Sequence, residues 1–281
     1  MPNIHPLSVI EPGAELADDV EVGPFCHVGP QVKIGPGTRL LSHVAIHGRT
    51  TLGAHNTVWP NAVLGGDPQD LKYKGEESEL VIGDHNDLRE GVTIHKGTAG
   101  DSALTRVGDH NLIMAYVHVG HDCMLGSHLV IANAVQLAGH ILIEDHAVIG
   151  GATAVHHWVT IHQYAFVAGM TRIVQDVPPF MIVEGAPARV RKVNTVLLKR
   201  HHFPQDQINR LKEAHRLLFG PTDDEGYVGN MARNLDALEA RAGEDWAQHA
   251  LVQAVRQSTR GIFGRHREAS RQDNRYTNPV R

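Results

Sequence analysis

The feature that most constrains the fold is an aliphatic residue that recurs every six positions along most of the chain. Counted in blocks of six, the first position is Ile, Leu or Val throughout residues 4–64, 82–94 and 107–173. Glycine is frequent at position two, and position five is mostly small or β-branched. A period of six fits neither a 3.6-residue helical turn nor the two-residue alternation of an uninterrupted strand. It predicts short strands joined by a turn in every block, with positions one and five facing inward.

This repeat resembles that of the hexapeptide-repeat acyltransferases, whose chains form a left-handed parallel β-helix. The resemblance implies three blocks per triangular coil, so that residues 18 apart stack about 4.8 Å apart on one face. We therefore expect a β-solenoid, a left-handed parallel β-helix, over residues 1–190. The period comes from the sequence itself, and the handedness comes from the resemblance alone.

Two breaks interrupt the repeat, and breaks of this kind in solenoids form loops on one face that often carry function. The first break, 65–81, is polar and contains Asp70 and Lys72. The second break, 99–106, is short. Taken alone, Asp70 and Lys72 are most simply interpreted as residues of an ordinary solvated loop.

The six-residue pattern ends near DVPPF at 176–180. A short basic segment, 193–201, is followed by an amphipathic pattern over 205–219 that ends at a Gly-Pro pair. Two more helices are predicted over 228–241 and 244–260, which makes 191–264 a C-terminal helical domain. The last residues, 265–281, contain five arginines and few apolar side chains, which predicts a disordered basic tail.

Composition excludes several classes of protein. The chain has 281 residues and a net charge of −5, which argues against a partner that is a nucleic acid. No apolar run approaches the roughly 20 residues of a membrane helix, and MPNIHPLSVIEPG has no signal-peptide pattern, so we expect no membrane insertion. The two cysteines, Cys26 and Cys123, fall at inward position five and are expected to be core residues. Two unpaired cysteines fit a reducing compartment, so a cytoplasmic location is predicted.

The stretch VHVGHDCMLGS, 117–127, draws attention because it holds two histidines, an aspartate and a cysteine. With 18 residues per coil, five polar or small residues form one outward patch over three successive coils. They are His121, Asp122, Gly139, His140 and His157, with His95, His118 and His156 at its edges. The other histidines, such as His27, His43, His85, His110, His128 and His146, are expected to be solvent-facing or turn residues.

This patch admits two kinds of chemistry. A single imidazole with a pKa near 6.5 can take a proton from a hydroxyl group, and a neighbouring carboxylate would orient it. Asp122 can help His121 only if the pair lies in a turn, and Gly139 leaves space above His121 and a backbone N–H for an oxyanion. A zinc site would need three ligands in tetrahedral reach, and His118 and His121 supply two only if both turn towards one point.

Seven segments, in their order and spacing, resemble the UDP-N-acetylglucosamine acyltransferase family, which begins lipid A synthesis. They are PQDLKYKGE (68–76), VTIHKGT (92–98), HVGHDC (118–123), LAGH (137–140), GATAVHH (151–157), QDVPP (175–179) and NTVLLKRHHF (194–203). The resemblance implies direct transfer of a 3-hydroxyacyl group from acyl carrier protein to the 3-hydroxyl of UDP-N-acetylglucosamine, without a covalent intermediate, cofactor or metal.

The same resemblance assigns roles to individual residues. It makes His121 the general base, Asp122 its partner and the Gly139 N–H the oxyanion donor. It places Asp70, Lys72, His95, His118, His140, His156 and His157 around the substrates, and Asn194 and Arg200 at the nucleotide, where a cationic Arg suits a pyrophosphate. It directs the acyl chain to a groove near Phe166, Gly169, Met170 and Pro187, where the small Gly169 leaves room for a long chain.

Three positions depart from the family pattern, namely His157, Val196 and His201. They fall at the implied sugar and nucleotide positions, so N-acylation of a 3-amino sugar nucleotide is an alternative function. A zinc carbonic anhydrase on the same β-helix, with His118 and His121 as ligands, is a further alternative. Related proteins form homotrimers with active sites between subunits, so Asp70 and Lys72 could meet His121 across an interface.

Overall fold

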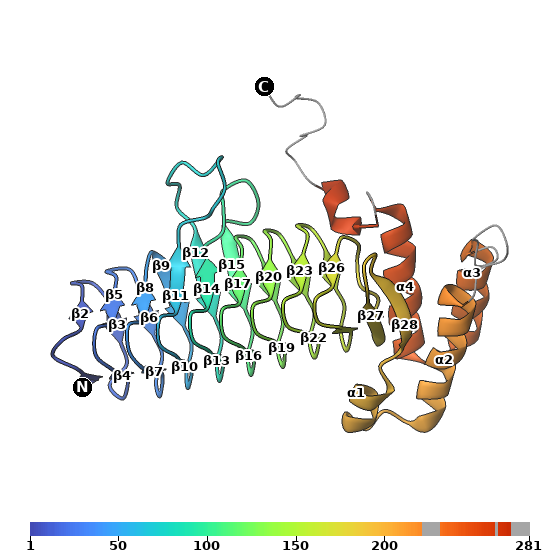
Figure 1. The fold of residues 1–281 in the computed structure, drawn as a ribbon, viewed down its shortest axis with the longest axis horizontal. Helices are drawn as coiled ribbons and strands as arrows, with labels where there is room; N and C mark the ends of the chain where they lie inside the picture. Colours follow the sequence, from blue (N-terminus) through green and yellow to red (C-terminus); the bar gives the residue numbers. More distant parts are fainter. Residues whose placement is uncertain (221–230, 262–263, 271–281) are drawn as a thin grey trace.

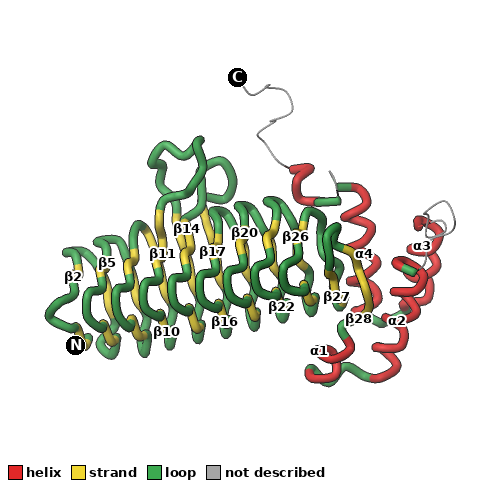
Figure 2. The backbone as a smooth tube through the Cα atoms, in the orientation of Figure 1, coloured by secondary structure: helices red, strands yellow, loops and turns green. Residues whose placement is uncertain are grey.

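The computed structural model describes residues 1–220, 231–261 and 264–270. Most of the chain winds into a left-handed parallel β-helix, and a group of helices lies at its C-terminal end (Figure 1). The strands are mostly two residues long, and Figure 2 shows them as short yellow segments separated by green turns. The prediction from the six-residue period, a coil of short strands with a turn in every block, is therefore confirmed.

The strands form three parallel sheets that run the length of the solenoid. Sheet A contains β1 (Asn3–Ile4), β4 (Glu21–Val22), β7 (Arg39–Leu40), β10 (Thr57–Val58), β13 (Asp87–Leu88), β16 (Leu112–Ile113), β19 (Val130–Ile131), β22 (Val148–Ile149), β25 (Phe166–Val167), β27 (Met181–Glu184) and β28 (Arg189–Val193). Sheet B contains β2 (Val9–Ile10), β5 (His27–Val28), β8 (Ala45–Ile46), β11 (Val63–Gly66), β14 (Thr93–His95), β17 (His118–Val119), β20 (Gln136–Leu137), β23 (Ala154–Val155) and β26 (Arg172–Ile173). Sheet C contains β3 (Glu15–Leu16), β6 (Lys33–Ile34), β9 (Arg49–Leu52), β12 (Glu79–Ile82), β15 (Leu104–Val107), β18 (Met124–Leu125), β21 (Leu142–Ile143) and β24 (Thr160–Ile161).

The alternation of inward and outward positions explains the core. Block positions one and five, such as Val119 and Cys123, are fully buried in one continuous apolar cluster. Position four takes a left-handed backbone, with φ of +58° at both Asp122 and His128, and this residue bends the chain from one sheet to the next. Cys26 and Cys123 are buried and unpaired, and burial raises the pKa of Cys123 to about 12.

Both breaks in the repeat occur at the same corner of the triangle. One loop joins β11 to β12 and the other joins β14 to β15, so both lie where sheet B passes to sheet C. Figure 1 shows them projecting together from one edge of the solenoid. The coils keep their register across the insertions, because Leu64 pairs with Ile94 and Ile94 pairs with Val119.

The solenoid ends in an antiparallel hairpin of β27 and β28, after which the chain becomes helical. The helices are α1 (Thr195–Arg200), α2 (Gln205–Phe219), α3 (Met231–Ala242) and α4 (Trp246–Arg260). Phe180, Met181 and Val193 of the last coil and the hairpin belong to the second apolar cluster, which joins the solenoid to these helices. Residues 228–230 of one predicted helix lie outside the described residues.

The prediction of a disordered tail from residue 265 is wrong for its first part. Arg265 is 5% exposed and its Nε donates to Glu268 at 2.6 Å, while His266–Ser270 form a 3-10 helix, η1. The segment is held against the last coil because Arg265 Nη1 donates to the Val174 carbonyl at 2.6 Å. The composition of this segment predicted disorder. The segment is ordered instead, because Arg265 pairs with Glu268 and donates to a backbone carbonyl of the last coil. Residues 271–281 lie outside the described residues.

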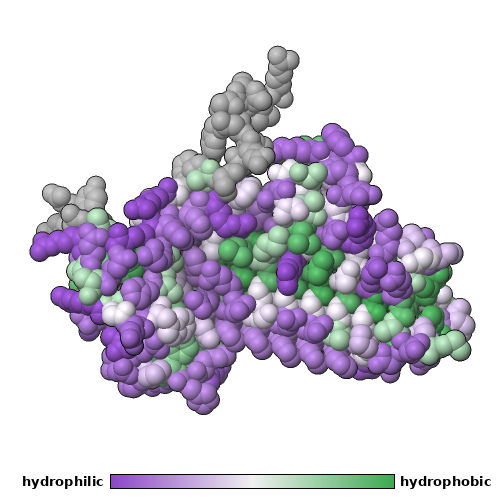
Figure 3. Space-filling model, turned by 180° about the vertical axis from the view of Figure 1, so that it is seen from behind, coloured by the Kyte–Doolittle hydropathy of each residue, from purple (hydrophilic) through white to green (hydrophobic). Residues whose placement is uncertain are grey.

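None of the described helices is long and apolar enough to cross a membrane. Seen from behind, the solenoid presents an apolar stripe along its length (Figure 3). Outward positions of sheet A include a row of half-buried apolar side chains. They are Leu112, Val130, Val148 and Phe166.

Candidate active site

One corner of the solenoid carries all the predicted catalytic residues and several of the predicted substrate-binding residues. We call it the B–C corner and define it by residues 67–78, 96–103, 120–123, 138–141, 156–159 and 174–176, which connect sheet B to sheet C. His121 and Asp122, then Gly139 and His140, then His157 follow one another on successive coils there. The predicted patch is therefore a continuous column.

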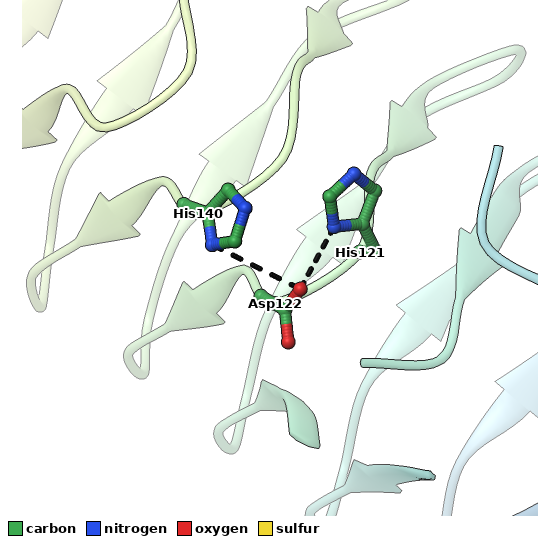
Figure 4. Close-up of side chains that lie close together, drawn as sticks. All are labelled: His121, Asp122 and His140. Carbon is green, nitrogen blue, oxygen red and sulfur yellow. Dashed lines mark hydrogen bonds and ion pairs between the residues drawn. The ribbon is translucent and has the colours of Figure 1, made fainter. Parts of the chain in front are cut away.

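His121 and Asp122 form a hydrogen-bonded pair. His121 Nδ1 and Asp122 Oδ2 are 2.8 Å apart, although the two residues are adjacent in sequence (Figure 4). On a regular strand their side chains would point to opposite faces. The left-handed backbone at Asp122 removes that constraint, which meets the condition that the sequence set for the pair. The Asp122 side chain is fully buried and that of His121 is 14% exposed, so one partner is fixed and the other faces solvent.

Two threonines hold the buried carboxylate in place. Thr98 donates its backbone N–H to Asp122 Oδ1 at 2.8 Å and its hydroxyl to Oδ2 at 2.7 Å. Thr105 Oγ1 accepts the Asp122 backbone N–H at 2.8 Å. Every oxygen of the carboxylate thus has a donor, which is the condition for burying a charged group. Neither threonine was predicted as a site residue, because Thr98 borders the second break and Thr105 lies within it, where the repeat does not operate.

Gly139 makes room for the imidazole itself. A Cβ at Gly139 would lie 2.6 Å from His121 Cε1 and 2.7 Å from Nε2, closer than carbon atoms can approach. This corrects the expectation that the missing side chain leaves open space above His121, because the His121 ring occupies that space. Within the described residues the Gly139 N–H has no hydrogen-bond acceptor, so it remains available as a donor.

His140 is fixed by three neighbours. Its Nδ1 lies 2.8 Å from Asp101 Oδ2 and 3.8 Å from Asp122 Oδ2, and its ring stacks on Trp158 with centroids 4.2 Å apart. The hydrogen bond to His140 lowers the pKa of Asp101. Figure 4 shows His121 and His140 facing Asp122 from two coils. Sequence analysis missed Asp101 and Trp158.

A pocket of about 490 Å³ joins these residues to the first inserted loop. Its lining includes Asp70 and Lys72 from the loop and His121, Gly139, His140, His157 and Trp158 from the coils. Lys96, which is mostly buried, anchors the loop through Asp67 at 3.0 Å and the Tyr73 hydroxyl at 3.3 Å. Asp70, Lys72 and His121 therefore meet within one chain, without the neighbouring subunit that the sequence invoked.

His95 and His118 lie beside this pocket on the face of sheet B. Their rings meet edge to face with centroids 5.0 Å apart, and Thr93 Oγ1 lies 2.8 Å from His118 Nδ1. Burial, followed by the neighbouring histidines, lowers the pKa of His95 to about 4, and burial also lowers the pKa of His118. Both rings therefore remain neutral at pH 7. His156 lies two coils beyond His118, with its ring centroid 3.8 Å from that of His157.

The residues close enough to share a metal ion differ from those that the zinc hypothesis named. His121, Asp122 and His140 each offer a ligand atom within 4.8 Å of the others, whereas His118 is not part of this group. In this group both Nδ1 atoms face a carboxylate that already accepts from Thr98. These contacts favour a hydrogen-bonded pair over a metal centre among the described residues.

Comparison with known proteins decides the family. The family model described as Udp N-acetylglucosamine O-acyltransferase, Domain 2, matches residues 176–263. An acyl-[acyl-carrier-protein]–UDP-N-acetylglucosamine O-acyltransferase of Saccharophagus degradans is 46% identical over 92% of this chain and 98% of its own. A protein of the same name from Pseudomonas putida W619 is 43% identical over 92% of this chain and 100% of its own. The chain belongs to the UDP-N-acetylglucosamine O-acyltransferase family.

Solved structures of the family agree with this fold. The UDP-N-acetylglucosamine O-acyltransferase of Moraxella catarrhalis is 40% identical and matches with a TM-score of 0.82 over 89% of this chain and 95% of its own. The UDP-N-acetylglucosamine acyltransferase of Campylobacter jejuni is 35% identical, with a TM-score of 0.84 over 91% of this chain and 96% of its own. The expected β-helix with a helical C-terminal domain is confirmed.

The residues that the family resemblance places at the nucleotide lie away from this pocket. Asn194 is 4% exposed and caps α1, since its Oδ1 accepts from Leu197 N and its Nδ2 donates to the Tyr164 carbonyl. Arg200 is exposed on α1, which Figure 1 places on the opposite edge from the inserted loops. Val196 is also exposed, and the His201 ring lies 4.6 Å from that of His146.

The residues proposed for the acyl groove gather at the last coils. Phe166 points outward from β25, which pairs with β27, and Pro187 lies in the turn between β27 and β28. Gly169 and Met170 are exposed in the turn between β25 and β26. None of the four lines the 490 Å³ pocket. A Cβ at Gly169 would lie 3.1 Å from the Gly151 carbonyl oxygen, so the space there is narrow.

Proposed function

We propose that this chain transfers a 3-hydroxyacyl group from acyl carrier protein to the 3-hydroxyl of UDP-N-acetylglucosamine, the first step of lipid A synthesis. Family membership over nearly the whole chain supports the reaction. The observation that carries the mechanism is the His121–Asp122 pair at 2.8 Å on the wall of the pocket.

His121 acts as the general base in this proposal. An ionised carboxylate only accepts hydrogen bonds, so Asp122 keeps the proton on His121 Nδ1 and leaves the Nε2 lone pair for the substrate hydroxyl. As the hydroxyl attacks the thioester carbonyl, its proton passes to Nε2 and the charged imidazole is stabilised by Asp122. The thiol of acyl carrier protein is the leaving group, and it receives that proton when the intermediate collapses.

The Gly139 N–H is the proposed donor to the oxyanion of the tetrahedral intermediate. It is adjacent to the imidazole, because the His121 ring lies against Gly139. Donors already oriented towards the developing charge stabilise it without reorganisation. A covalent route through Cys123 is disfavoured, since this thiol is fully buried and its pKa is raised to about 12.

We further propose that the active form is a cytoplasmic homotrimer. Asn194 and Arg200 lie far from the pocket of their own chain, so a neighbouring copy would have to bring them to the nucleotide. An apolar stripe on the solenoid supports self-association, because monomers rarely expose large contiguous apolar patches. Light scattering tests this directly, and a monomer at micromolar concentration with full activity would refute it.

The decisive experiment is a mass-spectrometric assay of the purified full chain. It offers 3-hydroxyacyl carrier proteins of several lengths with UDP-N-acetylglucosamine or its 3-amino analogue. We expect an O-acylated sugar nucleotide, and a loss of at least about 10²-fold in kcat for His121→Ala, as expected for removal of a general base. Lack of product from every pair would refute the enzyme assignment, and full activity of His121→Ala would refute the mechanism alone.

The acyl-transfer assay, together with measurements of bound zinc and of carbon dioxide hydration, separates the alternatives. Faster formation of an amide than of an ester would favour the 3-amino sugar nucleotide, which the family departure at His157, on the pocket wall, keeps under consideration. Zinc bound in a 1:1 ratio and lost in His121→Ala or His140→Ala, together with hydration of carbon dioxide, would favour the carbonic anhydrase.

A further inference from the structure

The segment Arg265–Ser270 reaches the active-site column from beyond the part of the chain that the family model matches, which ends at residue 263. Its first two residues both donate hydrogen bonds to the last coil. Arg265 Nη1 donates to the Val174 carbonyl at 2.6 Å, and His266 N donates to Asp176 Oδ2 at 2.8 Å. Asp176 N in turn donates to the Gly264 carbonyl at 2.8 Å. These contacts fix where the next side chain must lie.

That next side chain, Arg267, extends along the B–C corner to the pocket wall. Its Nη1 donates to the His140 carbonyl at 2.8 Å, and its guanidinium lies over the Trp158 ring, 5.9 Å from the centroid. His140 and Trp158 are the stacked pair that lines the pocket. Asp101 holds His140 Nδ1 at 2.8 Å. The stack is therefore held by two residues outside the repeat.

We propose that Arg265–Ser270 is a working part of the active site, in which Arg267 and Asp101 are positioning residues that hold His140 and Trp158 at the pocket wall. This inference rests on the proposed function, because its kinetic effect is expected on KM for the sugar nucleotide. Arg267 fixes the backbone of His140 and the face of Trp158, and Asp101 fixes the direction of the His140 ring. Both residues act through His140, which contacts substrate in the proposed reaction.

The expected effect falls on substrate binding rather than on proton transfer. His121 is oriented by Asp122, which Thr98 holds independently of Arg267. We therefore expect Arg267→Met and Asp101→Asn to raise KM for the sugar nucleotide about tenfold while kcat changes less than about threefold. Arg267→Lys keeps a donor for the carbonyl but loses the planar group over Trp158, so its KM should be intermediate.

The test combines kinetics with a double-mutant cycle on the full chain. Arg241→Met is the matched control, since Arg241 is an exposed arginine on α3 that pairs with Glu213 at 3.5 Å. It should leave KM unchanged. In the His140→Ala background, Asp101→Asn should add no further rise in KM, because the ring that Asp101 holds is gone. A KM effect of Asp101→Asn that persists there would mean that Asp101 itself contacts substrate, and its positioning role would be wrong.

A second measurement needs no turnover. Diethyl pyrocarbonate modifies accessible imidazoles, and peptide mass spectrometry measures the rate at each histidine. The His140 side chain is 16% exposed, so its rate should be low in the native chain and rise at least about threefold in Arg267→Met and Asp101→Asn. The rates at His85 and His110 should not change, which also checks that the variants are folded.

The outcomes distinguish the two proposals. If the native chain is active but Arg267→Met and Asp101→Asn match it in both KM and His140 labelling, the inference fails and the function stands. If the native chain makes no product, the function fails, and the His140 labelling rates still decide whether Arg267 and Asp101 hold the ring. Where Arg267→Met lowers the melting temperature by more than a few degrees, Arg267→Lys and Asp101→Asn decide in its place.

Discussion

Two corners of the same solenoid are rich in histidine and yet differ in kind. At the corner between sheets C and A, five imidazoles stack face to face on successive coils, with neighbouring centroids 4.8–5.0 Å apart. They are His55, His85, His110, His128 and His146, and Tyr164 continues the stack 4.7 Å further on. We call this the ladder. At the B–C corner, His121 and His140 are held by carboxylates instead.

The difference lies in what the coils receive from outside the repeat. Along the ladder, each ring from His85 to His146 has rings of the two adjacent coils as its neighbours. At the B–C corner, the second inserted loop brings Thr98 and Asp101 to the column, and the first brings Asp70 and Lys72. The repeat thus places the histidines, and the insertions supply the groups that orient them. Histidine content alone says nothing about which corner performs chemistry.

The largest contrast should come from removing one carboxylate at each corner. Asp122→Asn should lower kcat by about 10²–10³-fold, because His121 loses the group that fixes its tautomer and stabilises its charge. Asp145→Asn alters the residue beside the ladder, where Oδ1 accepts from Ser127 N at 2.7 Å, and should change kcat less than about twofold. Steady-state kinetics of both purified variants measure this, and equal losses would mean that the corners do not differ in function.

The second contrast is in stability at acid pH. The pKa of His95 is about 4 in the folded chain and near 6.5 in the unfolded one, so the unfolded state gains a proton first as the pH falls. The free energy of unfolding should therefore decrease between pH 6.5 and about 4, by up to about 3 kcal/mol. Burial, with His201 and His128, lowers the pKa of His146 in the ladder in the same direction.

Urea unfolding at pH 7.5 and 4.5 measures this loss. His95→Gln should remove most of the difference between the two pH values, because no proton is then taken up at that site on unfolding. His146→Gln should remove a smaller part. If the pH dependence of His95→Gln equalled that of the native chain, the burial of His95 would not be its source.

The third contrast concerns space beside the general base. Gly139→Ala should lower kcat by about 10–100-fold, since the new Cβ would lie 2.6 Å from His121 Cε1 and must displace the ring. Gly29→Ala is a matched change on a distant coil, where the nearest atom to the new Cβ would be 3.3 Å away, and should leave kcat within about twofold. A Gly139→Ala enzyme with native kcat would show that the ring position is not critical.

The smallest contrast tests the ladder itself. His110→Ala removes a ring that stacks on both His85 and His128, and should lower the free energy of unfolding by about 1 kcal/mol without changing kcat. His110→Tyr should restore most of that stability, because Tyr164 already occupies the equivalent place in the stack. Chemical denaturation measures both, and no difference between Ala and Tyr would show that stacking contributes little.

These two corners also show what could be predicted from the sequence. The period placed His121, Asp122, Gly139, His140 and His157 on one column, because residues 18 apart are equivalent wherever the repeat is unbroken. It gave Asp122 a turn position, which the left-handed φ of +58° confirms. Four ladder residues, His85, His110, His128 and His146, were expected as solvent-facing or turn residues. Their stacking was not predicted, and the step from His85 to His110 crosses an insertion that hides the equivalence.

The residues that were missed lie where no period operates. Thr98 and Asp101 sit in or beside the second break, and Arg267 lies in a segment whose composition predicted disorder. Trp158 was missed for a different reason: it occupies a regular turn position, but its stacking on His140 depends on which side chains meet there. Periodicity reports equivalence between coils, whereas contacts made by loops and tails depend on tertiary packing that a repeat does not encode.

The hydrogen bond from Arg265 to the Val174 carbonyl has a consequence for the order in which parts of the site form during protein synthesis. Ribosomes release the chain from its N-terminus, so the coils that carry His121 and His140 emerge and can stack long before residue 265 is made. Arg267, which contacts the His140 carbonyl, follows 127 residues after it. A nascent chain therefore carries His121 and His140 on stacked coils well before the side chain that braces His140 has been made.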